Sequence, residues 1–427
     1  MTILLMLLAM FALILINVPI AVALGLVGVV AVWVTQGPDM LPNVAIVMFE
    51  GASSFPLLAI PMFILAGALM NASSISLRLF ALASALLGFI RGGLAMVNVG
   101  VSMFFSELSG SAVAGVAATA PLLIPAMHKR GYPRPFTAAV TSSSATLAII
   151  LPPSIPMILY GVMAEASIVQ LFVAGIVPGL IAGFLMMALC YYYARRYNWP
   201  VEEIFNLCRV WVTFKEAFWA LFLPVIILGG IFGGVVTATE GGALAVVAAL
   251  FLGVFVYRDL DLKFLYEAII EGAIQTAVVM LLVAASALVG VYLTEMRIPG
   301  QLAVAILSVT SESWAILALL NIFFLAIGLF LHSAAAIILV VPVVMPLVVA
   351  AGIDPIHFGV VVCLNLSIGQ QTPPVASVLI TTCAIAKADV WEVTRANMGF
   401  IGVLTATLLI STYIPAVPLV LVEYFYR

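Results

Sequence analysis

Two stretches, Ile150-Leu151-Pro152-Pro153-Ser154 and Gln370-Gln371-Thr372-Pro373-Pro374, each place a pair of prolines in the middle of an apolar segment. Proline has no backbone N–H, and lipid cannot satisfy the carbonyl groups that it leaves free, so such breaks persist at membrane depth only inside protein or beside a polar cavity. The two pairs lie 221 residues apart. Paired breaks in two related halves are typical of the binding site of a secondary transporter.

The same spacing of 221 residues extends beyond the two proline pairs. Three further residues recur at this distance, as the pairs Pro121 and Pro342, Pro125 and Pro346, and Gly131 and Gly352. We therefore expect two repeats, residues 1–215 and 216–427, that descend from one ancestral unit.

Composition places these breaks in a membrane protein. Of the 427 residues, 65% are hydrophobic and 8% are charged, whereas a soluble domain carries roughly 25% charged residues. A spanning helix needs about 20 apolar residues, so the chain has room for around a dozen spans or re-entrant segments. We predict an all-α polytopic membrane protein.

Several other classes of protein lack support in the sequence. The four cysteines have no CxxC or metal-ligand spacing, which gives no reason to expect a metal site or a disulfide. No long basic run indicates a nucleic-acid partner. No nucleophile–base set, P-loop or HExxH motif is present, so the sequence does not predict an enzyme.

Each proline pair lies near the centre of about thirty residues, at about 134–164 and about 355–386. Thirty residues overrun one span as a straight helix but fit a helical hairpin that enters and leaves the membrane on one side. A proline-kinked spanning helix is the alternative. Because the whole pattern repeats, we favour two re-entrant hairpins.

The charges near the two hairpins differ. Lys129, Arg130 and Arg134 stand at the base of the first hairpin, whereas the equivalent positions of the second half carry no charge. This asymmetry suits an inverted repeat with the first base in the cytoplasm. Arg195 and Arg196, one apparent span later, are also basic, so charge alone leaves the orientation open.

Small polar side chains cluster beside both breaks. Hydroxyl and amide oxygens, together with the freed carbonyl groups, supply what a dehydrated Na⁺ needs, and the half-helix N-termini direct positive dipole ends at an anion. The alternative is that the small residues only allow close helix packing. The candidates for substrate contact within the hairpins are Ser143, Ser144, Ser154, Asn365 and Gln371.

Ionisable groups inside apolar segments are costly and therefore candidates for function. His332 lies between two long apolar blocks, and we expect it, with Ser333, to contact substrate. A structural role for this histidine is the alternative. Arg297 is a further candidate for an anionic group, although a side chain at the end of a span also snorkels to the interface. Glu240 follows Thr237 at the spacing of a capping box, so a role at the start of a helix accounts for this carboxylate as well as a role in transport does.

Further motifs follow one another along nearly the whole chain. They are Phe55-Pro56-Leu57-Leu58-Ala59-Ile60-Pro61, Leu108-Ser109-Gly110-Ser111-Ala112, Pro152-Pro153-Ser154-Ile155-Pro156, Leu171-Phe172 to Pro178-Gly179, Thr237-Ala238-Thr239-Glu240, Gly352-Ile353-Asp354-Pro355 and Gly369 to Pro374. In these motifs the chain resembles the large membrane subunit of TRAP (tripartite ATP-independent periplasmic) transporters, the DctM-like family.

The resemblance implies an elevator-type, Na⁺-coupled importer of an organic acid anion in the bacterial inner membrane. A transport domain that holds both hairpins would slide against a static scaffold. The implied partners are a small four-helix membrane subunit, a periplasmic substrate-binding protein and membrane lipid. The segments at 36–54 and 197–214, which carry aromatic and charged residues between spans, are candidate contacts to these partners. We expect the segment at 197–214 to be an interfacial, helical connector between the two halves. The alternative is an autonomous Na⁺-coupled carboxylate permease of related architecture that needs no binding protein.

The resemblance also implies ligands for about two Na⁺ ions. Carried over by position, the first site would use Ser109 and the carbonyl groups of Ala148, Leu151 and Pro153. By the repeat, the second would use Phe330, Gly369 and Thr372. Family members usually carry an acid where this chain has His332, and a histidine there would suit a carboxylate or sulfonate.

Overall fold

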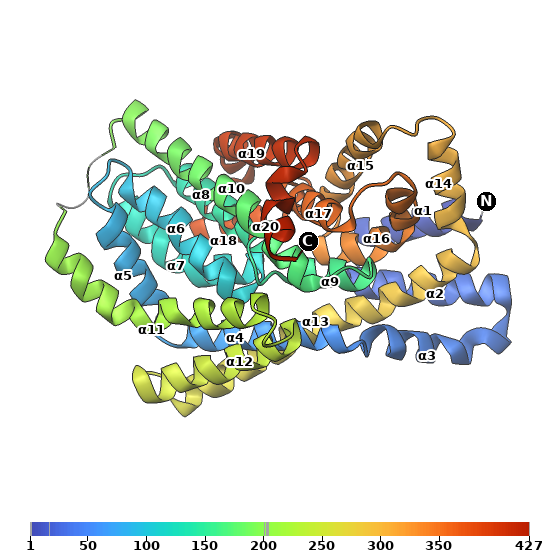
Figure 1. The fold of residues 1–427 in the computed structure, drawn as a ribbon, viewed down its shortest axis with the longest axis horizontal. Helices are drawn as coiled ribbons and strands as arrows, with labels where there is room; N and C mark the ends of the chain where they lie inside the picture. Colours follow the sequence, from blue (N-terminus) through green and yellow to red (C-terminus); the bar gives the residue numbers. More distant parts are fainter. Residues whose placement is uncertain (1, 17, 200, 202–204, 427) are drawn as a thin grey trace.

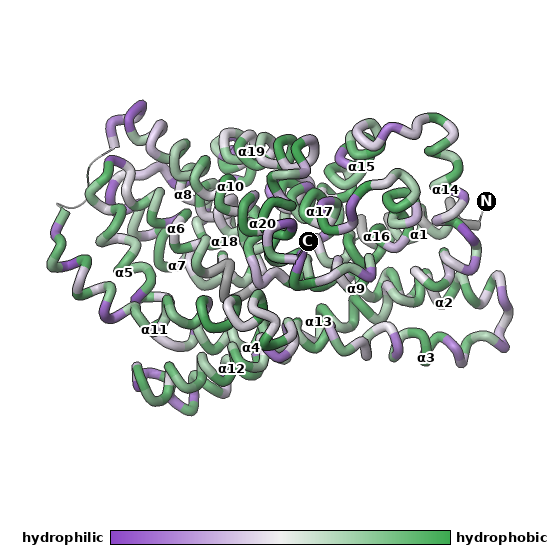
Figure 2. The backbone as a smooth tube through the Cα atoms, viewed as in Figure 1, coloured by the Kyte–Doolittle hydropathy of each residue, from purple (hydrophilic) through white to green (hydrophobic). Residues whose placement is uncertain are grey.

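The computed structural model describes residues 2–16, 18–199, 201 and 205–426, and these residues form twenty α-helices and no β-strand (Figure 1). Eight helical segments among them are long and apolar enough to cross a membrane. Hydrophobic residues follow most of the helical paths, and hydrophilic residues gather at loops and helix ends (Figure 2). The prediction of an all-α polytopic membrane protein is confirmed.

The helices of the first half carry short 3₁₀ turns between them. They are α1 (Thr2–Leu15), α2 (Ile20–Gln36), η1 (Pro38–Met40), α3 (Leu41–Ala52), η2 (Phe55–Leu58), α4 (Ala59–Ala72), α5 (Ile75–Leu87), α6 (Gly93–Ser109), α7 (Ala112–Lys129), α8 (Arg134–Ala145), η3 (Thr146–Ile149), α9 (Ile155–Met163) and α10 (Ile168–Arg196).

The second half contains the longest helix. Its helices are α11 (Leu207–Phe232), α12 (Ala238–Phe251), η4 (Leu252–Val256), α13 (Leu262–Glu295), α14 (Ile298–Leu307), α15 (Ser313–Gly328), α16 (Ser333–Ala350), α17 (Pro355–Gly369), α18 (Ser377–Ala386), α19 (Val390–Tyr413) and α20 (Ala416–Tyr426). The helices α16 and α17 begin 221 residues after α7 and α8, as the sequence spacing indicates.

Both proline segments are interrupted helices. In the first, α8 ends at Ala145, and α9 begins at Ile155 after Ser154, whose hydroxyl caps it by accepting from the N–H of Met157 at 3.4 Å. In the second, α17 ends at Gly369 and α18 begins at Ser377. Each arm is shorter than the about 20 residues of a span. The structure therefore has two short helices at each site rather than one kinked helix.

The second arm of each proline segment packs against the other half of the chain. The helix α9 lies on α16, while α18 lies on α7 and α8. The hydroxyl of Tyr160 in α9 also donates to the carbonyl of Pro355, at the start of α17, over 2.7 Å. Because each second arm packs on the opposite half, both proline segments form one body with α6–α8 and α15–α17.

A second group of helices lies beside this body. The 34-residue helix α13 packs against α2, α3 and α4, and α12 packs against α4. In Figure 1 these helices follow the lower edge of the molecule, whereas α8, α10, α17 and α19 lie above them. The two groups meet where α5 and α4 touch α6 and where α13 and α14 touch α16.

The connector between the halves differs from our expectation. We expected an interfacial helix over residues 197–214, but α10 ends at Arg196 and the next helix begins at Leu207. Residues 200 and 202–204 lie outside the described part of the chain. Asn206 caps α11 by accepting from the backbone N–H groups of Cys208 and Arg209, which sets the start of the helix.

Candidate functional site

The first break frees backbone oxygens in the way that its sequence predicts. In a continuous helix the N–H groups of residues 152 and 153 would donate to the carbonyl groups of Ala148 and Ile149, but the prolines at these positions have no N–H. The hydroxyl of Ser154 donates to Ile149 at 2.8 Å. The N–H of Ile155 donates to Gly110 at 3.2 Å, so it does not serve Leu151. Ala148 and Leu151 thus keep carbonyl oxygens without their helical donors.

The loop after α6 lies directly against this break. Gly110 has a φ of +59°, and a Cβ atom there would lie 3.1 Å from the carbonyl oxygen of Pro153. The structure therefore brings the chain beside Ser109 together with Pro153, as the predicted first ion site requires. The side chain of Ser109 lies outside what the structure describes, so its contribution stays a prediction.

The second break is built on the same plan. The N–H of Val375 donates to the carbonyl of Leu329, next to Phe330, at 3.2 Å. Gly369 packs so closely on Gly328 that a Cβ atom would lie 2.6 Å from its backbone. The hydroxyl of Thr372 donates to Ile368 at 3.0 Å, which leaves its oxygen lone pairs available. Neutral oxygens again gather where a loop meets a break.

A buried amide network joins the two proline segments. The Oε1 atom of Gln371 accepts from the hydroxyl of Ser142 at 2.9 Å and from Nδ2 of Asn397 at 3.0 Å. Its Nε2 atom donates to the carbonyl of Ser142 at 2.8 Å. The hydroxyl of Ser143 donates to Oδ1 of Asn397. All four residues are buried, so the polar groups of Gln371 hold α8 and α19 together.

Two more polar clusters lie inside the same body. Ser144 shares a hydrogen bond of 2.8 Å with Ser102 and donates to Asn98 at 3.3 Å, which links α8 to α6. On the other side, Asn365 donates to Asn321 at 2.7 Å, which links α17 to α15. Buried polar groups must find partners at membrane depth, so these bonds hold the interrupted helices in place.

His332 occupies the N-cap of α16, and Ser333 is buried beside it. The Nδ1 atom of His332 accepts from the N–H of Ala334 at 3.4 Å. In the neutral ring this bond assigns the proton to Nε2, which can donate to a ligand. Arg297 stands at the N-cap of α14 and is exposed. Among the described residues no hydrogen bond joins it to the other candidates.

The sequence analysis missed several members of these clusters. Asn98 and Asn321 each lie within a largely apolar stretch of helix, and an amide in such a stretch is the signal that could have found them. Asn397 follows Glu392 and Arg395 in α19, so its amide does not stand out in the sequence. In the described part of the chain no three His, Cys, Asp or Glu residues come together. A cation bound here would rely on neutral oxygens.

Comparisons with known proteins agree with the all-helical membrane fold. Residues 7–417 match the family described as the tripartite ATP-independent periplasmic transporter, DctM component. The chain is 41% identical to the isethionate TRAP transporter permease protein DctMQ of Oleidesulfovibrio alaskensis, over 96% of this chain and 65% of that protein. It thus spans slightly less than two thirds of that relative.

Two further relatives match over nearly their whole length. The C4-dicarboxylate TRAP transporter large permease protein DctM of Pseudomonas aeruginosa is 39% identical, over 93% of each chain. The 2,3-diketo-L-gulonate TRAP transporter large permease protein YiaN of Escherichia coli is 38% identical, over 94% of each. Among solved structures, the YdaH transporter of Alcanivorax borkumensis has a TM-score of 0.67 over 92% of this chain and 90% of its own, at 14% identity, which shows a shared fold.

The contact between Gly369 and Gly328 yields a prediction. Replacing Gly369 with Ala places a methyl group 2.6 Å from backbone atoms, so we expect a loss of about 1–3 kcal/mol in unfolding free energy. Thermal unfolding of the purified protein measures it. Gly402→Ala is the control, because a Cβ atom there meets nothing within 4 Å. Equal unfolding midpoints for the two variants would contradict the close contact.

Proposed function

The chain belongs to the DctM component family of tripartite ATP-independent periplasmic transporters, and from this premise we propose that it is the large permease subunit of a Na⁺-coupled importer of an organic acid anion. The family is one of multi-pass proteins of the bacterial inner membrane, and its members are permeases rather than enzymes. The observation that carries the proposal is the pair of breaks at which neutral backbone oxygens gather.

The donor set at the breaks fits Na⁺. At the first break the candidate oxygens are the carbonyl groups of Ala148, Leu151 and Pro153, and at the second they belong to Gly369 and Thr372 with the backbone near Phe330. Hard cations take oxygen ligands, and a singly charged ion needs no carboxylate to balance it. When bound, Na⁺ would supply positive charge beside the substrate. The residues of this chain hold the oxygens in place through Gly110, Gly328 and the amide network.

An organic acid anion fits the same region. The helices that begin after His332 and after Ser154 each direct the positive end of their helix dipole toward a break. Nε2 of His332 adds a donor. Relatives are named for isethionate, C4-dicarboxylates and 2,3-diketo-L-gulonate. We therefore propose a carboxylate or sulfonate as the transported group.

The two groups of helices support an elevator mechanism. The body that contains both proline segments is cross-linked internally by the network around Gln371 and by the bond from Tyr160 to Pro355. The helices along α13 lie outside this network. We propose that the cross-linked body is the transport domain and that α2–α5 and α11–α13 form the scaffold.

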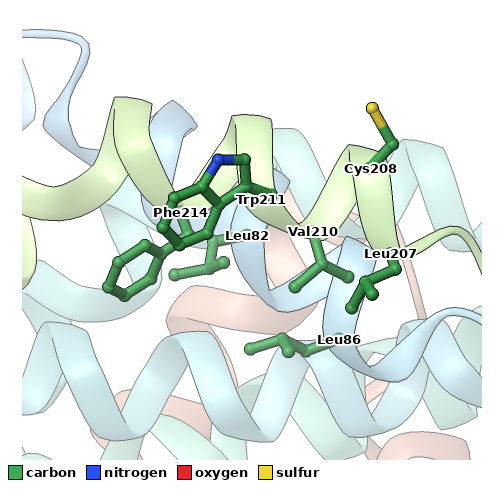
Figure 3. A pocket seen from close by; sticks show the side chains of 7 residues that line it. All are labelled: Leu82, Leu86, Leu207, Cys208, Val210, Trp211 and Phe214. Carbon is green, nitrogen blue, oxygen red and sulfur yellow. The ribbon is translucent and has the colours of Figure 1, made fainter.

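The partners of the permease are a small membrane subunit and a periplasmic binding protein. The scaffold carries an apolar groove of about 660 Å³ between α5 and α11, lined by Leu82, Leu86, Leu207, Cys208, Val210, Trp211 and Phe214 (Figure 3). Its α11 side belongs to the connector for which we expected partner contacts. We propose that this scaffold face receives the small subunit.

Na⁺ dependence provides the first test. Replacing Thr372 with Val removes one candidate ligand, so we expect a several-fold higher Na⁺ concentration for half-maximal uptake of labelled substrate. Thr381→Val is the matched control, because both hydroxyls donate to the carbonyl four residues earlier, Thr381 at 2.8 Å and Thr372 at 3.0 Å. Full uptake by the unaltered chain without Na⁺ and without a proton gradient would contradict Na⁺ coupling.

His332 provides the second test. Replacing it with Ala removes both the Nε2 donor and the helix cap, whereas Asn removes that donor but restores a capping oxygen. We expect both variants to need about tenfold more substrate for half-maximal uptake, with the Na⁺ dependence unchanged. Thermal unfolding should recover in His332→Asn. If the substrate concentration for half-maximal uptake is unchanged in both variants, His332 has only a structural role.

The partners provide the third test. Proteoliposomes that contain the chain alone should transport poorly even when the protein is folded. Adding the small subunit and the loaded binding protein should raise Na⁺-driven uptake at least tenfold. Equal uptake with and without the partners would favour an autonomous permease.

A further inference from the structure

Adjacent glutamines at the second break have opposite environments. Gln371 is fully buried, and both of its amide atoms have protein partners. Gln370 is only 2% exposed, yet neither its Oε1 nor its Nε2 atom has a hydrogen-bond partner among the described residues. Burying an amide without partners costs on the order of 1–3 kcal/mol by the measure of protein mutations. The environment of Gln370 therefore requires a partner from outside this chain.

The helical register shows which way Gln370 faces. On α17 and its final turn, Gln370 follows Cys363 by seven residues and Gly359 by eleven, so the three share one face. A Cβ atom on Gly359 would lie 2.6 Å from the ring of Tyr160 in α9 and 2.5 Å from Leu171 in α10. This face of α17 is thus turned toward the first proline segment. The helix α17 also contacts η3, where that segment is interrupted.

The chemistry of an amide limits what its partner can be. A Na⁺ ion could engage Oε1 but would leave the two N–H groups of Nε2 without an acceptor. An oxygen of an anionic substrate satisfies Nε2 and leaves Oε1 for a neighbouring cation or a hydroxyl of the substrate. A bond from a neutral donor to a carboxylate or sulfonate is stronger than one between neutral groups. Gln370 adjoins Gly369, a candidate ligand of the second ion site. An anion there would lie close to the coupling ion.

We propose that Gln370 binds the transported anion, donating through Nε2 to a carboxylate or sulfonate oxygen held between the two breaks. This inference rests on the proposed function and adds a specificity-determining residue to it. Gln371, in contrast, has a structural role. Substitutions at the two adjacent positions should therefore have different effects: those at Gln370 should weaken substrate binding, and those at Gln371 should weaken the packing of the transport domain.

The test uses two variants at 370 and one at 371. Gln370→Met keeps the shape without polar atoms, Gln370→Glu replaces the donor with a negative charge, and Gln371→Met removes the amide network. Each is expressed with the small subunit and the binding protein, and uptake of labelled isethionate, succinate and 2,3-diketo-L-gulonate is measured. Unfolding midpoints are recorded without substrate.

We expect Gln370→Met to raise the half-saturating concentration of the transported acid about tenfold, and Gln370→Glu to raise it further. Without substrate, Gln370→Met should unfold at or above the temperature of the unaltered chain, whereas Gln371→Met should unfold at a lower one. If Gln370→Met lowers the unfolding temperature and leaves the half-saturating concentration unchanged, Gln370 holds a structural water and the inference is wrong. If the unaltered chain takes up none of the three acids, the proposed function fails with it.

Discussion

The structure depends on four prolines that have no N–H to give. At Pro152, Pro153, Pro373 and Pro374 the ladder of helical hydrogen bonds stops in the middle of an apolar segment, where lipid cannot replace the lost donors. The chain responds in the same way at both breaks. A loop from a neighbouring helix comes close enough to receive one backbone N–H, from Ile155 to Gly110 and from Val375 to Leu329. The close approach explains why Gly110, Gly328 and Gly369 have no side chains.

The remaining polar groups follow from the same constraint. Short helices that end inside a membrane protein need lateral anchors, and the amides of Asn98, Asn365, Asn397 and Gln371 supply them. Because Gln371 bonds to both α8 and α19, a displacement of one proline segment would break hydrogen bonds to the other. Breaking buried bonds of this kind is costly, so motion of the body as a unit is favoured over motion of one segment.

Much of this architecture could be predicted from the proline spacing. The predicted limits of the segments, about 134–164 and about 355–386, coincide with the start of α8 at Arg134 and the end of α18 at Ala386. The packing of α9 and α18 against the opposite half of the chain could not be predicted. The apolar side chains of these helices fit many apolar neighbours, so their sequences do not specify one. The sequence did not single out Asn397 for a related reason, because its partner Gln371 is 26 residues away, in the break between α17 and α18. The connector was mispredicted because its aromatic residues suit both an interfacial helix and a helix that begins only at Leu207.

The near absence of charge in the candidate site has a consequence for coupling. An anion that enters an environment of neutral oxygens and amides loses its hydration without gaining a formal positive charge from the protein, and a cation alone faces the same cost. Each ion reduces that cost for the other when both are bound a short distance apart in a medium of low polarity. In the proposed mechanism, neutral donors such as Gln370 and His332 would orient the anion without neutralising it. The requirement to carry both ions together would then arise from desolvation, and a fixed arginine or lysine in the site would weaken it by stabilising the anion alone.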